Sequence, residues 1–206
     1  MSHTHPLARS VRTLRGDALI GAFVKRHGPI SHRRSHAMGA FQSLSESIIY
    51  QQLSGKAADT ICKRFIALFP RKMFPSPKDV LRIKTEALRS AGLSAQKASY
   101  LKDLAQKFVD GTIDEKQFGT MTDAEIIEHV TAVKGIGEWT AQMFLMFTLA
   151  RPDVLPTGDL GIQKAFKRVF GLRALPKPER MEVLAKCWAG HRTVACFYLW
   201  RMLDEP

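Results

Sequence analysis

Apolar residues recur along this sequence every three to four positions, whereas stretches that alternate apolar and polar residues are nearly absent. One such face consists of Ala57, Ile61, Phe65 and Leu68, and a second consists of Ala98, Leu101, Ala105 and Phe108. This spacing places side chains on one side of an α-helix. The sequence therefore predicts an all-α fold.

Capping residues and glycines predict where several helices begin and end. The predicted starts are Ser43 with Glu46, Ser76 before Pro77, and Thr122 with Glu125, because each places a side-chain acceptor near unpaired amides. Gly92 and Gly111 are predicted stops, and residues 69–77 and 151–158 are predicted breaks.

Composition restricts the class of partner. The 206 residues include 31 Lys and Arg against 19 Asp and Glu, and this net charge of +12 favours a polyanionic partner over a merely solvated basic surface. No apolar stretch is long enough for a bilayer, so no membrane partner and a cytoplasmic location are expected. The three cysteines fit neither a zinc nor an iron–sulfur pattern, and we expect them to be reduced core residues.

Residues 133–137, Val-Lys-Gly-Ile-Gly, lie between two amphipathic helical stretches and predict a tight hairpin. Gly135 and Gly137 let the backbone turn sharply and approach a neighbouring surface without a Cβ in the way. Amides at this turn and the start of the next helix would attract phosphate. A plain connection between two helices is the alternative interpretation.

The residues around this turn resemble the AlkA-type 3-methyladenine DNA glycosylases of the helix-hairpin-helix superfamily. The matching segments are Lys134–Ala141, Leu155–Ile162, Ile48–Ala58, Gly92–Ala98, Trp188 and Arg192–Thr193. The resemblance implies two helical lobes with the active-site cleft between them. Residues 42–155 would form the central lobe with the hairpin, and residues 1–41 and 156–206 would form the second.

The resemblance implies a monofunctional DNA glycosylase of base excision repair. Such an enzyme flips alkylated bases of the 3-methyladenine or 7-methylguanine type out of duplex DNA and hydrolyses the N-glycosidic bond. Its expected partner is duplex DNA containing alkylated bases, and it is expected to be a monomer that requires no cofactor. Its expected place is the nucleoid of a prokaryotic cytoplasm or a eukaryotic nucleus.

The resemblance assigns the catalytic role to Asp159, which also has the sequence context of a helix N-cap. A carboxylate there can stabilise positive charge on the sugar or orient water. The predicted base pocket contains Trp139, Met143 and His191. Trp139 stands where bifunctional relatives have their lysine nucleophile, and a buried core tryptophan is the alternative interpretation. Gly190 and His191 replace the usual proline and aromatic residue, so we expect a less aromatic, more open pocket.

DNA is expected to contact two segments. The hairpin residues Lys134, Gly135, Ile136 and Gly137 would face phosphate, and Gln51, Gln52 and Ser54 would face the minor groove, with Gln52 as the side chain that fills the vacated space. An ordinary exposed loop is the alternative for the second segment. The resemblance further implies a structural Na⁺ or K⁺ ion on the main-chain carbonyls of Thr131, Val133 and Gly135.

Two other functions fit the sequence less well than this one. A non-catalytic hairpin module that only binds duplex backbone would have no use for Asp159 at the expected place after the hairpin. A bifunctional glycosylase for oxidised bases would need a lysine at Trp139, and the four-cysteine cluster of such relatives is missing.

Overall fold

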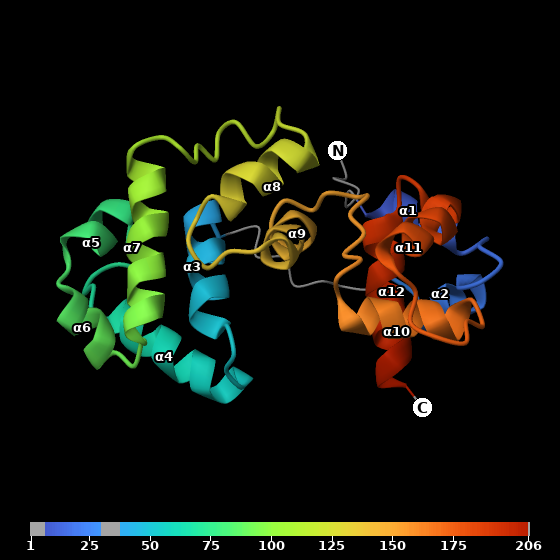
Figure 1. Cartoon of the computed structure of the whole chain (residues 1–206), viewed down its shortest axis with the longest axis horizontal. Helices are drawn as coiled ribbons and strands as arrows, with labels where there is room; N and C mark the ends of the chain where they lie inside the picture. Colours follow the sequence, from blue (N-terminus) through green and yellow to red (C-terminus); the bar gives the residue numbers. More distant parts are fainter. Residues whose placement is uncertain (1–6, 30–37, 206) are drawn as a thin grey trace. The chain divides into compact units, whose positions relative to one another are not determined.

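The computed structural model describes residues 7–29 and 38–205, and every regular element within these residues is a helix (Figure 1). The all-α prediction is therefore confirmed. None of the helices in the described ranges is long and apolar enough to cross a membrane.

The described residues divide into two compact units. One unit combines the N-terminal helices with the residues from Leu145 onward, and the other ends at Phe144. The first unit contains α1 (Ala8–Leu14), α2 (Gly21–His27), α10 (Leu160–Val169), α11 (Pro178–Leu184), the 3₁₀ turn η1 (Ala185–Trp188) and α12 (Arg192–Asp204). The second contains α3 (Ala40–Tyr50), α4 (Gly55–Ala67), α5 (Pro77–Arg82), α6 (Thr85–Ser90), α7 (Ala95–Val109) and α8 (Asp123–Thr131). Helix α9 (Glu138–Phe147) runs across the division.

The second unit is organised around α7, which packs against α3, α5 and α6 (Figure 1). Leu101 and Leu104 of α7 are fully buried, as are Leu44 and Ile48 of α3. Helix α4 also packs on α3. The loop between α3 and α4 and the start of α7 both contribute to the candidate site.

The first unit is organised around α12, which packs against α1, α2, α10 and η1. All seven residues from Thr193 to Leu199 are buried, so this part of the helix is covered on every side, whereas Arg201 and Asp204 near its end are exposed. Burial on all sides explains why α12 lacks a polar stripe at helical spacing in the sequence.

Most predicted helix ends are confirmed. Ser76 and Thr122 form capping boxes with Asp79 and Glu125, and both accept a backbone N–H. Gly92 (φ +102°) and Gly111 (φ +81°) follow α6 and α7 in the left-handed conformation that stops a helix.

Ser43 was wrongly predicted as a helix start. Helix α3 already begins at Ala40, and the backbone N–H of that residue is bonded to the carboxylate of Glu115 at 3.0 Å. A cap supplied from a distant segment leaves no local pattern. Ala57 was also misplaced: the buried face of α4 is formed by Ala58, Cys62 and Phe65.

The predicted and observed divisions of the chain differ at both boundaries. The prediction ended the central lobe at residue 155, whereas residues from Leu145 onward belong to the first unit. The reason is that Phe147 packs on Phe197 and Trp200, and the main chain near Pro152 is bonded to Thr193 of α12. Residues 38–41 belong to the second unit because α3 begins there.

Cys62 and Cys196 are buried free thiols, as expected, and burial raises the pKa of Cys62 to about 11. Cys187 is exposed, so the prediction of a core position was wrong for this residue. Among the described residues, no group of three His, Cys, Asp or Glu side chains is arranged to hold a metal ion.

Candidate functional site

The hairpin connects α8 to α9, and its turn depends on Gly135. This residue has φ +81°, and a Cβ placed on it would lie 2.1 Å from the ring of Tyr100. Ile136 anchors the turn from beneath, since its side chain is buried and its N–H donates to the carbonyl of Val133 at 3.1 Å. The prediction of a tight helix-to-helix turn is confirmed.

Only part of the hairpin backbone has donors left for an external ligand. The N–H of Lys134 donates to the carboxylate of Asp103 at 2.8 Å, so this amide already has a partner. In the described part of the chain, the N–H groups of Gly135 and Gly137 have no acceptor. A Cβ on Gly137 would meet nothing within 4 Å. This edge of the turn is therefore accessible to an anionic ligand.

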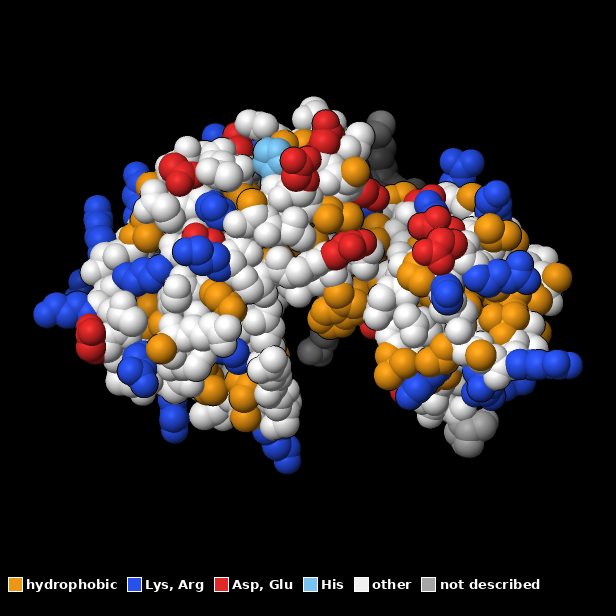
Figure 2. Space-filling model, viewed as in Figure 1, with side chains coloured by type: hydrophobic (Ala, Val, Ile, Leu, Met, Phe, Trp, Pro, Cys, Tyr) orange, Lys and Arg blue, Asp and Glu red, His pale blue; other side chains and the backbone are white. Residues whose placement is uncertain are grey.

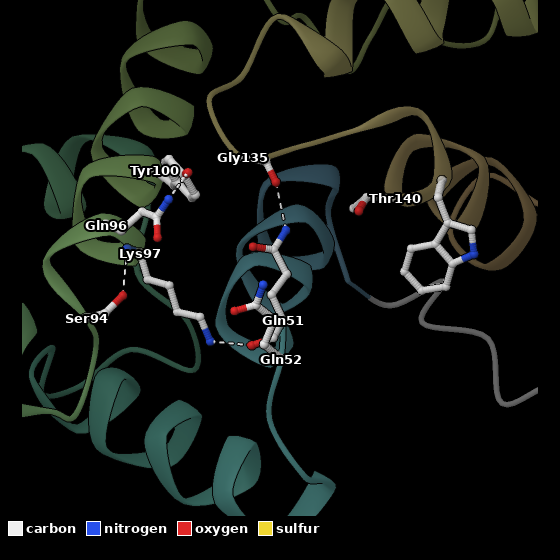
Figure 3. Close-up of a pocket in the computed structure, with 9 residues that line it drawn as sticks. Gln51, Gln52, Ser94, Gln96, Lys97, Tyr100, Gly135 and Thr140 are labelled. Carbon is white, nitrogen blue, oxygen red and sulfur yellow. Dashed lines mark hydrogen bonds between the residues drawn. The ribbon is translucent and has the colours of Figure 1, made fainter. Parts of the chain in front are cut away.

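The loop between α3 and α4 carries the predicted wedge residue. Gln52 is exposed and has φ +56°, a left-handed conformation that is uncommon without glycine. Gln51 points its side-chain amide at the hairpin and donates to the carbonyl of Gly135 at 2.8 Å (Figure 3). Ser54 is exposed at the start of α4.

Two neighbouring cavities in the second unit share Gln51, Gln52, Trp139 and Thr140. The smaller, of about 320 Å³, is also lined by Ser47, Tyr50 and Met143, and the larger, of about 500 Å³, by Tyr100, Lys97 and Gly135. Trp139 is 51% exposed, which argues against the alternative of a buried core tryptophan. The structure thus brings Trp139 and Met143 together on one wall of a cavity.

Tyr50, Thr140 and Ser47 line this cavity but were not singled out from sequence. The hydroxyl of Tyr50 donates to the carboxylate of Asp59, and this bond raises the pKa of the phenol, with burial adding to the effect. A neutral phenol therefore stands at the cavity. Thr140 directly follows Trp139 in α9, and no local sequence pattern distinguished it from its neighbours.

Asp159 stands immediately before α10 and caps it. Its Oδ1 accepts the N–H of Ile162 at 2.8 Å and the indole N–H of Trp200 at 2.9 Å. Gly161 makes room for this arrangement, since a Cβ there would lie 3.0 Å from both Oδ1 of Asp159 and the ring of Trp200. The predicted cap is confirmed, and Trp200 is a neighbour of the carboxylate that sequence reasoning missed.

The segment that leads to Asp159 is fixed by the start of α12. Arg192 forms a two-pronged ion pair with Asp153, with N–O distances of 2.7 and 2.6 Å. The buried Thr193 hydroxyl donates to the carbonyl of Arg151 and accepts the N–H of Val154. The Arg192-Thr193 pair identified in the sequence therefore holds residues 151–154, which precede Asp159, in place.

His191 is bonded through Nδ1 to the hydroxyl of the buried Ser10 at 2.9 Å. It belongs to the first unit and precedes α12. Trp139 and Met143 belong to the second unit, so the cavity described above does not include His191. Its assignment to a base pocket stays a prediction.

Two of the three carbonyls predicted to hold a cation already accept a hydrogen bond. Val133 accepts the N–H of Ile136, and Gly135 accepts the amide of Gln51. A carbonyl oxygen has two lone pairs, so each retains one for a metal ion. The residues fit a weakly bound monovalent cation, and that site stays a prediction.

Basic side chains are scattered over the visible face of the molecule, interspersed with acidic ones (Figure 2). On this face the Lys and Arg side chains do not gather into one continuous patch. A spread positive charge suits non-specific attraction to a polyanion.

Comparison with known proteins places these features in a family context. Residues 46–190 match the HhH-GPD superfamily of base excision DNA repair proteins. Over 165 residues the chain is 37% identical to DNA-3-methyladenine glycosylase 1 of Schizosaccharomyces pombe, covering 78% of this chain and 71% of that protein. The range matched by the superfamily, residues 46–190, includes the α3–α4 loop, the hairpin and Asp159.

Solved structures give the same answer for the fold. A 3-methyladenine DNA glycosylase from Schizosaccharomyces pombe, in complex with abasic DNA, aligns with a TM-score of 0.82 and 31% identity over 95% of this chain and 97% of that one. A DNA-3-methyladenine glycosidase from Bacillus halodurans aligns with a TM-score of 0.83 and 33% identity over 100% and 94%. These similarities confirm the resemblance indicated by the sequence motifs.

Proposed function

The chain belongs to the HhH-GPD superfamily of base excision DNA repair proteins, and we propose that it is a monofunctional DNA glycosylase that releases alkylated bases from duplex DNA. The expected substrates are bases of the 3-methyladenine and 7-methylguanine type. The observation that carries the proposal is Asp159, a carboxylate fixed at the start of α10 by two N–H donors.

Binding begins at the hairpin in this proposal. The N–H groups of Gly135 and Gly137 donate to a DNA phosphate, and the partly positive start of α9 adds to the attraction. A monovalent cation on the carbonyls of Thr131, Val133 and Gly135 would supply further positive charge there. These contacts recognise the DNA backbone and are independent of sequence. The protein acts on DNA as a monomer.

The damaged base leaves the helix and stacks on Trp139. An indole face attracts a cationic ring, and alkylation at N3 or N7 gives the purine a positive charge. The half-exposed ring and the adjacent cavity of about 320 Å³ support this role. Gln52 fills the space left in the duplex.

Cleavage of the N-glycosidic bond then requires little acid catalysis, because a cationic purine is already a good leaving group. The bond between C1′ and the base nitrogen breaks, and its electron pair leaves with the base. The Asp159 carboxylate stabilises the positive charge that develops on the sugar and orients a water molecule. The water oxygen bonds to C1′ and its proton passes to the surrounding solvent, which leaves a neutral abasic sugar and the neutral free base.

The test is excision by the purified protein from duplexes that each carry one alkylated base, with alkali used to cleave abasic sites. Asp159→Asn keeps the size and capping ability of the side chain but removes its charge. We expect this variant to bind the duplex normally and to release base at least ~100-fold more slowly. Near-normal base release by this variant would contradict the catalytic assignment.

A further inference from the structure

The wedge residue Gln52 sits in a loop that two other segments hold in place. On one side, the Gln51 side chain donates to the hairpin carbonyl of Gly135 at 2.8 Å. On the other, the ammonium group of Lys97, at the start of α7, donates to the carbonyls of Ile49 and Gln51 at 2.8 and 2.7 Å (Figure 3). The residue directly before the wedge is thus bound at both its side chain and its main chain.

These contacts answer two needs of the local chain. The last carbonyls of α3 have no partner within the helix, and α3 has no basic residue in its last turn, so Lys97 supplies the capping charge. Gln52 adopts φ +56°, a left-handed conformation that is unfavourable for a residue with a Cβ. A strained conformation persists only when its surroundings hold it.

We infer that Gln51 and Lys97 are positioning residues that couple the hairpin to the wedge, rather than side chains that contact DNA. The inference rests on the proposed function. In this arrangement the Gln51 hydrogen bond joins the hairpin that binds phosphate to the loop that enters the duplex. The position of the hairpin on the backbone therefore fixes where Gln52 meets the base stack. Gln51 changes from a predicted DNA contact to an internal link.

The chain contains a matched control for Lys97. Lys102 lies on the same helix, and its ammonium group donates to the carbonyls of Leu81 and Ile83 at the end of α5. Both lysines are half-buried, and burial lowers the pKa of each. Lys97→Met and Lys102→Met therefore remove the same kind of helix cap, but only the first borders the wedge loop.

The first measurement needs no catalysis. A duplex with a stable abasic-site analogue and 2-aminopurine opposite the gap reports wedge insertion through fluorescence, while titration reports affinity. We expect Lys97→Met to bind within about threefold of the original protein but to lose most of the fluorescence change, and Lys102→Met to retain it. Gln51→Met keeps the length of this half-buried side chain but removes its N–H donor, so it should behave like Lys97→Met.

The second measurement is single-turnover excision of 7-methylguanine. Opposite cytosine, Lys97→Met and Gln51→Met should be about tenfold slower than the original protein, a change of ~1.4 kcal/mol in the barrier. Opposite a mismatched base, which makes flipping easier, the defect should shrink below about threefold. Equal defects on both duplexes, or an unchanged fluorescence response, would overturn the inference. If the original protein releases no base, the proposed function fails, while the fluorescence measurement still tests the coupling.

Discussion

The carboxylate of Asp159 owes its orientation to a tryptophan 41 residues further along the chain. Trp200 stacks on Phe147 and Phe197, with interplanar angles of 22° and 29°, and this stacking aims its indole N–H at Oδ1 of Asp159. Trp200 is therefore a positioning residue for the proposed catalytic group.

Trp200→Phe keeps an aromatic ring in the stack and removes the N–H donor. A hydrogen bond to a charged group contributes about 1.5–3 kcal/mol, so we expect base release to slow by about tenfold while duplex affinity stays unchanged. Single-turnover excision and titration of an abasic duplex measure the two quantities.

Trp188→Phe is the matched control, because the indole N–H of Trp188 donates to the carboxylate of Asp17 at 3.0 Å, in the same unit as Asp159. Since Trp188 is fully buried, this variant should lose more thermal stability than Trp200→Phe. Its folded fraction should keep the original excision rate. A rate loss as large as that of Trp200→Phe would show that the indole bond to Asp159 has no special role.

The sequence predicted Asp159 at this site but not Trp200, and the physical reason is the kind of signal involved. An N-cap is a local pattern, readable from Gly-Asp before an amphipathic stretch. The bond to Trp200 depends on how α10 packs against α12, and spacing along the chain does not encode it. Gly161, inside the first turn of α10, was the only local hint, since an internal glycine often permits a close approach.

At the scale of elements, the two hairpin glycines have different roles. Gly135→Ala would force a Cβ against Tyr100 at a left-handed position, so we expect losses of both thermal stability and DNA affinity. Gly137→Ala leaves the fold intact, because its Cβ would point into open space. It should weaken binding to all duplex sequences by about tenfold and flatten the salt dependence if phosphate contacts are lost.

Gly119→Ala is the control for this pair, since a Cβ there also meets nothing within 4 Å and Gly119 lies between α7 and α8, outside the hairpin. Binding titrations at several salt concentrations compare the three variants. If Gly137→Ala and Gly119→Ala bind equally well, the turn does not touch DNA.

Helix boundaries were predictable where the stop or start is local. Thr122 and Gly111 were placed correctly because a capping box and a left-handed glycine act within a few residues. Ser43 was wrong because the amide of Ala40 is capped by Glu115, which is distant in sequence. The buried face of α4 was shifted by one residue at its start, since Ala57 and Ala58 are equally apolar and packing decides between them.

At the scale of the whole molecule, the division into two units was harder to read than the fold class. Both the observed and the predicted divisions make one unit from the two ends of the chain. The observed boundary, between Phe144 and Leu145, lies inside the continuous helix α9, where no helix break marks it. Phe147 joins the first unit through ring contacts with α12. Apolar residues of one continuous helix look alike in sequence whichever core they enter.

The residues available as nucleophiles determine whether a glycosylase only removes a base or also cleaves the strand. Strand-cleaving glycosylases form an imine between a protein amine and the sugar. Trp139 offers no amine. Lys134 lies in the hairpin, where its expected partner is phosphate, and the exposed Lys164 lies beyond the first turn of α10. Neither lysine lies at the position of Trp139, where the bifunctional relatives have their lysine nucleophile.

We therefore expect the protein to leave abasic sites in intact strands, and borohydride to trap no covalent complex with DNA. Denaturing electrophoresis of an alkylated duplex should show cleavage only after alkali, and no shifted protein–DNA band after borohydride. An imine-forming glycosylase assayed in parallel on its own substrate checks that trapping works. A trapped band that disappears in Lys134→Ala or Lys164→Ala would identify an amine nucleophile, and hydrolysis by water would then be the wrong mechanism.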